Sequence, residues 1–122
     1  MKKIILVIGV THDNVSKVYD WNDLVNERMI QDSLPGLPVL LMLDSDTASC
    51  YIYNRTIDGK ALQFKKDNNQ TSVREINTGS SWNLKGECTD GLYKGRKLHP
   101  VQSYQEFWHS WYTFHPNTLK YM

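Results

Sequence analysis

Cysteine is scarce in this chain, and long apolar runs are missing. The two cysteines, Cys50 and Cys88, allow one disulfide at most and do not form a Cys-x-x-Cys pair. No apolar stretch approaches the roughly 20 residues that are needed to cross a bilayer. We therefore expect neither a disulfide framework nor a membrane-spanning segment.

An excess of charge of either sign is also missing. Fourteen Lys and Arg oppose thirteen Asp and Glu, which gives a formal net charge of +1 at pH 7. No basic run is longer than Lys-Lys, whereas binding to a phosphate backbone requires clustered cations. Nucleic acid is therefore not an expected partner.

Sequence motifs for metals, nucleotides and nucleophilic catalysis are absent as well. His12, His99, His109 and His115 form no i, i+4 pair and have no cysteine at zinc-ligand spacing. The segment "TGSSW" at residues 78–82 offers hydroxyls and amides to an anion, but it lacks the P-loop lysine and the order of a nucleophile elbow. We predict no cofactor.

The composition of the chain is that of a folded protein. Of its 122 residues, 40% are hydrophobic and 22% charged, which predicts one globular domain over residues 1–122. The opening "MKKIILVIGV" has lysines ahead of an apolar run, as secretory signals do, but the run is short and lacks a small-x-small cleavage site. We interpret it as a strand.

The first part of the chain predicts a hairpin followed by a helical turn. Residues 4–19 contain two runs of strand-forming residues that are separated by the polar "THDN". Asp20 then stands at an N-cap position, with Asp23 three places later, where a carboxylate can reach free backbone amides. We expect this helical turn to pack Trp21 and Leu24 inward.

The middle of the chain predicts a bend, a central strand and a tight hairpin. Two prolines and a glycine in residues 33–38 indicate the bend, and residues 39–43 are uniformly apolar. Asp58 and Gly59 favour a two-residue type I′ loop. The register that follows from this loop pairs Ile57 with Lys60, Arg55 with Leu62 and Tyr53 with Phe64.

Alternation of side chains along this hairpin defines a candidate core face. Tyr51, Tyr53, Leu62 and Phe64 share one side and are the expected core residues. Arg55 lies at the margin of that face. We expect its stem to cover apolar surface and its charged head to reach water.

The last part of the chain predicts a strand at residues 71–76, a helix and a short edge strand. Ser103 and Glu106 form a capping box, and aromatic residues follow at i, i+3, i+4 and i+7 spacing, which predicts an amphipathic helix over residues 103–114. These aromatic residues are Tyr104, Phe107, Trp108 and Trp111. Residues 119–121 are expected to return as the edge strand.

The pattern as a whole predicts a mainly β (α+β) fold. Short strands without βαβ alternation favour an antiparallel sheet or a small barrel, with one C-terminal amphipathic helix packed on it.

One candidate site follows the apolar strand, at "DSDT" (Asp44, Ser45, Asp46, Thr47). Asp-x-Asp after a strand is typical of haloacid dehalogenase phosphatases, but the threonine is misplaced and a strand follows where that fold needs a helix. A calcium loop fails too, because Arg55 occupies the position of the closing glutamate. A hairpin turn explains these residues without a ligand, since each side chain can bond nearby backbone.

The succession of segments along the chain resembles a known family. The segments are "VIGV", "VYDWNDLV", "PVLLMLDSDTASCYIYNR", "DGKALQF", "NTGSSWNLKGECTDG", "GRKLHPV" and "FWHSWYTFHPNTLKYM". From about residue 4 to residue 121 they are similar to the bacterial family called domain of unknown function number 3179. Because members are mostly exported or lipid-anchored, the resemblance implies a periplasmic or extracellular location. It also implies that this chain is a shortened or partial copy of the family domain.

The resemblance also gives a meaning to the "DSDT" segment. Many members carry a Cys-Pro-Leu-Cys type motif there, and this chain has Asp44 and Thr47 at the two cysteine positions. Because a dithiol needs two sulfurs, a redox role of such members is not expected here.

Two hypotheses for function follow. The first is a non-catalytic binding or structural domain with an unknown small molecule or protein as partner. The alternative is a metal-dependent or redox-related enzyme with its site at the hairpin of residues 44–47. The candidate ligand-site residues are Asp44, Asp46, Thr47, Arg55, Thr78, Ser80 and Trp82.

Overall fold

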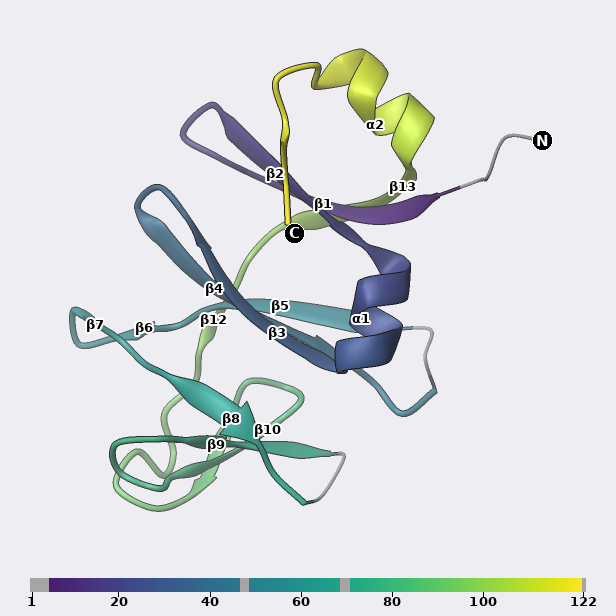
Figure 1. Ribbon diagram of the computed structural model, residues 1–122. Helices are drawn as coiled ribbons and strands as arrows, with labels where there is room; N and C mark the ends of the chain where they lie inside the picture. The colour runs from purple at the N-terminus through teal and green to yellow at the C-terminus, as the bar shows by residue number, and fades with distance from the viewer. Residues whose placement is uncertain (1–4, 47–48, 69–70, 122) are drawn as a thin grey trace.

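The computed structural model describes residues 5–46, 49–68 and 71–121, and three four-stranded sheets dominate it (Figure 1). The first sheet has the order β13-β1-β2-β14. Asp13 and Asn14 join β1 to β2 with positive φ angles of 48° and 66°, as a type I′ turn requires. The strands are β1 (Leu6–His12), β2 (Val15–Asp20), β13 (Ser103–Phe107) and β14 (Leu119–Lys120), and β14 pairs with β2 in parallel.

The second sheet contains the apolar strand that the sequence places at the centre. Its order is β12-β5-β4-β3, and six of the seven residues of β4 are buried. Helix α1 (Trp21–Glu27) leads into it from β2, and the Asp20 carboxylate caps this helix by accepting from the Asn22 amide. The strands are β3 (Met29–Leu34), β4 (Leu37–Leu43), β5 (Cys50–Asn54) and β12 (His99–Pro100).

The third sheet is small and irregular. Its order is β11-β10-β9-β8, and the hairpin of β6 and β7 connects it to the second sheet. The strands are β6 (Thr56–Ile57), β7 (Lys60–Ala61), β8 (Phe64–Lys66), β9 (Ser72–Glu75), β10 (Ser81–Asn83) and β11 (Cys88–Asp90).

Side chains of β4 divide the core into two main parts. Because successive residues of a strand point to opposite faces, Val39 and Leu41 pack with residues of the first sheet, whereas Leu40 and Met42 pack with residues of the third. Figure 1 shows the matching arrangement, with the second sheet between the other two. A mainly β fold with a C-terminal helix is therefore confirmed, but the sheets are open and do not close into a barrel.

The predicted hairpin at Asp58 and Gly59 is confirmed, although its register extends less far than expected. Both residues have positive φ, Ile57 pairs with Lys60, and the Leu62 amide donates to the Arg55 carbonyl. The expected pairing of Tyr53 with Phe64 is wrong, because Tyr53 pairs with Leu40 and Pro100 instead. The two aromatic side chains still belong to one cluster, since the strands diverge around a shared core.

The helix predicted over residues 103–114 is only half correct. The helix α2 is Trp108–Phe114, and residues 103–107 form β13, paired along its whole length with β1. Phe107 occupies the N-cap position without a side-chain cap. Backbone pairing with a buried strand outweighs the local capping signal of Ser103 and Glu106. The sequence analysis also missed β3, whose mixture of polar and apolar residues shows no clear period.

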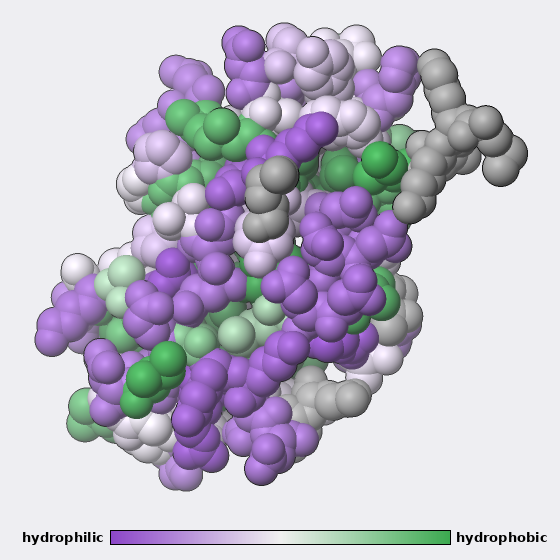
Figure 2. Space-filling view, viewed as in Figure 1, coloured by the Kyte–Doolittle hydropathy of each residue, from purple (hydrophilic) through white to green (hydrophobic). Residues whose placement is uncertain are grey.

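Helix α2 is held against the first sheet by Trp111, which packs over Gly9. A methyl group on Gly9 would lie 2.3 Å from the Trp111 ring, so only a glycine permits this contact. Across the ranges that the structure describes, neither helix has the length and apolar character needed to span a bilayer. Figure 2 shows a surface that is mostly hydrophilic on this face, with apolar residues visible in its upper part, over the first sheet.

Candidate functional site

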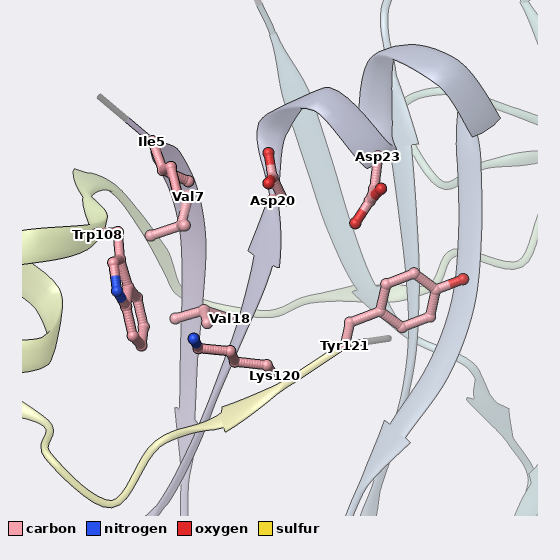
Figure 3. A pocket seen from close by; sticks show the side chains of 8 residues that line it. All are labelled: Ile5, Val7, Val18, Asp20, Asp23, Trp108, Lys120 and Tyr121. Atoms are coloured by element: carbon pink, nitrogen blue, oxygen red, sulfur yellow. The ribbon is translucent and has the colours of Figure 1, made fainter. Parts of the chain in front are cut away.

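A pocket of about 150 Å³ lies where Ile5 and the residues of and after β14 meet the start of α1 (Figure 3). Trp108 stands on one side and the carboxylates of Asp20 and Asp23 on the other, with Val7 and Val18 between them. Its full lining is Ile5, Val7, Val18, Asp20, Asp23, Trp108, Lys120 and Tyr121.

The apolar floor of the pocket follows from strand alternation. Val7 of β1 and Val18 of β2 point to the face of the first sheet that carries α2, where they pack with Trp111. Ile5 and Trp108 are partly buried against this cluster. Both are therefore fixed by packing while part of their surface faces the pocket.

The other wall of the pocket is acidic. Burial raises the pKa of Asp23, and the neighbouring carboxylates of Asp20 and Glu27 raise it further. The Tyr121 hydroxyl donates to Glu27 Oε1 at 3.1 Å. In the described ranges, no cationic side chain approaches Asp20 or Asp23 within 4.0 Å. A cation placed here would relieve the repulsion among these carboxylates.

One cation is already present in the pocket lining. The Lys120 Nζ lies 4.2 Å from the centre of the Trp108 ring, a cation–π distance. Two aspartates and one lysine give the lining a net charge of −1, since two negative charges oppose one positive charge. The pocket therefore combines an aromatic and aliphatic wall with an acidic one.

Ser45 and Asp46 of the "DSDT" segment lie in a turn after β4. Asp44 Oδ1 accepts from the Ser45 amide at 2.6 Å, and Asp44 Oδ2 accepts from the Tyr51 hydroxyl at 3.3 Å. Asp46 Oδ1 accepts from the Ser49 amide at 3.2 Å. The Arg28 guanidinium donates to the Asp44 carbonyl rather than to its carboxylate. Thr47 lies outside the described residues.

Arg55 is placed differently from the sequence-based expectation. Its side chain is not at a water-facing margin, since the residue is only 6% exposed. The guanidinium donates to three backbone carbonyls, those of Val39 at 2.8 Å, Leu62 at 2.7 Å and Asp32 at 2.9 Å. Burial lowers its pKa, against the opposing effect of the Asp32 charge. The expectation of a solvated head is wrong, because a buried charge requires hydrogen-bond partners and the strand edges supply them.

Thr78 and Ser80 are brought together around a buried carboxylate that the sequence analysis missed. Glu75 is fully buried and accepts from the amides of Asn77 and Thr78 and from the Thr78 hydroxyl. Burial alone would raise the pKa of Glu75, but these hydrogen bonds outweigh it and hold the pKa below its ordinary value. The Thr78 and Ser80 hydroxyls are 2.6 Å apart. Glu75 thus organises the loop, and no local motif in the sequence marks it.

Trp82 lies deep in the core of the third sheet. It is fully buried, and its ring meets Phe64 edge-on at a centroid distance of 5.9 Å. Its Nε1 has no hydrogen-bond partner among the described residues. Trp82 is therefore a packing residue beside the Glu75 loop.

The predicted site residues do not converge on one point. Asp44 and Asp46 follow the end of β4, whereas Arg55 bonds to its beginning, at the opposite end of the β4–β5 ladder. Thr78 and Ser80 belong to the turn between β9 and β10 of the third sheet. The residues that the sequence analysis combined into one candidate site therefore lie in three different parts of the fold.

The two cysteines are free thiols in different sheets. Burial raises the pKa of Cys50 to about 12, and burial also raises the pKa of Cys88. A high pKa leaves little of the nucleophilic thiolate at neutral pH. Across the described ranges, no three His, Cys, Asp or Glu side chains come together as a metal site would require.

The pocket residues escaped the sequence analysis because each has a plausible local role. Asp20 and Asp23 indicated a helix start, and Trp108 indicated the apolar face of a helix. No short-range signal shows that residues about a hundred positions apart share a cavity.

Comparison with known proteins assigns a family. The chain matches no curated protein and no solved structure. The family described as "Protein of unknown function (DUF3179)" matches residues 1–118, which is nearly the whole sequence. The chain therefore belongs to the DUF3179 family.

Proposed function

We propose that this chain is a non-catalytic binding domain whose pocket takes a small organic cation with an apolar body. The observation that carries the proposal is the juxtaposition of an acidic wall, at Asp20 and Asp23, with the apolar wall of Val7, Val18 and Trp108 in one cavity. Its charge and its shape favour the same class of ligand.

Charge favours a cation over an anion. The carboxylate of Asp23 is partly desolvated and repelled by its neighbours, which its raised pKa reflects. An ammonium group would form charge-assisted hydrogen bonds there. The one lysine of the lining is placed over Trp108, and among the described residues it forms no ion pair with Asp23 within 4.0 Å.

Size favours a ligand with one small ring or a short branched chain. A protein cavity of about 150 Å³ accepts a benzene molecule, and this pocket has about that volume. The apolar body would contact Val7 and Val18, while the ammonium group would reach Asp23. Contact with Trp108 adds aromatic packing, which is favourable for rings and for cations.

The remaining candidate groups support a non-catalytic role. Asp44 bonds to its own turn, Arg55 to three carbonyls and Glu75 to the loop that follows it. The Cys50 thiol has a pKa of about 12. Each of these groups stabilises the fold where the structure places it.

Three probes with the same phenylethyl body test the proposal. Phenethylammonium, 2-phenylethanol and 3-phenylpropionate carry the same ring and differ in charge. We expect phenethylammonium to bind best and 3-phenylpropionate worst, with amide chemical-shift changes in two-dimensional NMR centred on Val18, Asp23 and Lys120. Equal binding of the three probes, or chemical-shift changes elsewhere in the chain, would contradict the proposal. So would the absence of phenethylammonium binding at a ligand concentration of about 10 mM, because the affinity would then be weaker than millimolar.

The variant Asp23→Asn tests the charge of the pocket without changing its shape. We expect it to weaken phenethylammonium about fivefold, which corresponds to about 1 kcal/mol for one partly exposed charge-assisted contact. Binding of 2-phenylethanol should not change. Asp90→Asn, at an exposed aspartate of the third sheet, is the matched control and should leave both affinities unchanged. An equal effect of the two variants would assign the preference to the net charge of the protein instead.

A further inference from the structure

The edge of the first sheet at β13 has unpaired backbone groups. The Trp108 amide donates to the Ile5 carbonyl, and bonding along an antiparallel pair alternates from there. The backbone groups of Ser103 and Gln105 and the amide of Phe107 therefore point away from β1, whereas the Phe107 carbonyl accepts the first bond of α2. In the described part of the chain, β13 ends the sheet and has no neighbour on that side.

The other long or accessible sheet edges are protected against pairing with a further strand, whereas the edge at β13 is unprotected. At β3, the side-chain oxygen Oε1 of Gln31 accepts from the Phe64 amide, so the start of β8 lies against this strand. The edge strand β8 carries two lysines, β12 contains a proline, and β14 has two residues. Lysine, proline and short length are the usual defences of a sheet edge. Strand β13 has five residues, an uninterrupted register with β1, no proline and no lysine.

Large aromatic side chains are exposed along this edge. Tyr104 is 50% exposed and Phe107 is 56% exposed, on opposite faces of β13. Phe114, at the end of α2, is 79% exposed and lines a hollow with Tyr104 and Glu106. Apolar surface therefore continues from the free edge onto the adjoining helix.

We propose that β13 pairs antiparallel with β13 of a second copy of this chain, about a two-fold axis at Gln105. The two first sheets then form one continuous sheet across the dimer. Gln105 pairs with Gln105 of the other copy, and the Phe107 amide donates to the Ser103 carbonyl of the other copy. The Phe107 carbonyl is not needed for this pairing, because it accepts the first bond of α2. This inference concerns a different surface from the cation pocket and does not depend on it.

Side-chain complementarity selects this register. With the axis at Gln105, each Tyr104 lies opposite Glu106 of the other copy, in the closely spaced type of pair, about 4.5 Å between Cα atoms. An axis at Glu106 would place two carboxylates opposite each other, which is destabilising. An axis at Tyr104 would leave Phe107 opposite Val101, outside the strand. The axis at Gln105 alone pairs the full length of β13.

Sedimentation velocity over a range of protein concentration tests the pairing. We expect the sedimentation coefficient to rise from the monomer toward the dimer between about 10 μM and about 1 mM, the affinity range of a small interface. A monomer throughout this range would overturn the proposal. It would leave the edge open to a strand of a different protein, which is then the alternative occupant.

Two variants at one position identify the register. Tyr104→Glu places a carboxylate opposite Glu106 of the other copy, whereas Tyr104→Lys places an ammonium there, and both remove the same aromatic ring. We expect the lysine variant to dimerise about tenfold more tightly than the glutamate variant, because two cross-strand charge pairs change sign. The difference should shrink in high salt.

Each outcome of this comparison is informative. Equal affinities of the two variants would overturn pairing through β13 in this register. Circular dichroism and melting temperature establish that both variants fold, and the exposed position of Tyr104 favours this. The two variants also control for each other, so a loss common to both is separated from the effect of charge.

Discussion

Replacing Arg55 by methionine should destabilise the protein by about 3 kcal/mol or more. The substitution removes three hydrogen bonds, to the carbonyls of Val39, Leu62 and Asp32, from a residue that is 6% exposed. The carbonyls of Asp32 and Val39 keep their bonds in the β3–β4 ladder, so the loss is that of three hydrogen bonds rather than of three orphaned acceptors. At about 1 kcal/mol for each net hydrogen bond, the sum is about 3 kcal/mol. These carbonyls belong to β3, β4 and the segment that precedes β8, so the loss loosens the junction of the second and third sheets.

Urea unfolding followed by tryptophan fluorescence measures this loss. A change of about 3 kcal/mol moves the midpoint by about 1.5 M when the m-value is about 2 kcal/mol/M. Arg55→Lys keeps the charge but loses the planar donor set, so we expect a smaller loss. It also provides a folded variant if the methionine variant is too unstable to measure.

Arg96→Met is the matched control for Arg55→Met. The Arg96 guanidinium donates two hydrogen bonds, one to each carboxylate oxygen of Asp58. However, the Arg96 side chain is 45% exposed and that of Asp58 is 68% exposed. Exposed ion pairs contribute little, so we expect a far smaller change in midpoint. A loss of stability below about 1 kcal/mol for Arg55→Met, which is the scale of a single hydrogen bond, would refute the structural role assigned to Arg55. Equal losses of stability for Arg55→Met and Arg96→Met would refute it as well.

Three further predictions concern the packing, the pH dependence and the turn after β4. Gly9→Ala should cost about 2 kcal/mol by overpacking against Trp111, as measured by urea unfolding. Glu75→Gln should destabilise the protein above about pH 5 and destabilise it less in acid. The lowered pKa of Glu75 stabilises the wild type above the unfolded-state pKa of about 4.3, and this stabilisation is lost as the pH falls through the pKa of the folded state. Asp44→Ala should change the melting temperature little, and Mg²⁺ or Ca²⁺ should not raise the melting temperature of the wild type.

Each of these predictions has its own control. In a Trp111→Leu background, Gly9→Ala should cost less, and additive losses would contradict the proposed contact. An unchanged difference between wild type and Glu75→Gln from pH 3 to pH 7 would show that the Glu75 pKa is not lowered. A rise in melting temperature with a divalent ion, abolished by Asp44→Ala, would instead support the metal-dependent alternative.

Short-range patterns determined much of the fold. The Asp58-Gly59 turn, the hairpin of β1 and β2, the capped helix α1 and the buried strand β4 all follow from residues close together in the sequence. Turn conformation, capping and alternation are local properties, so a sequence contains them directly. The motif segments were also sufficient for the family.

Tertiary structure decided the features that depend on distant partners. Residues 103–107 carry a helix-capping signal, yet β1 supplies backbone pairing and makes them a strand. Arg55 is buried because three carbonyls from separate segments surround it, and Glu75 is buried because its own loop folds over it. The pocket joins Asp23 to Trp108 and Lys120 only after β14 pairs with β2. Burial, charge compensation and cavity shape are set by which distant segments pack together, and that information is not contained in any short stretch of sequence.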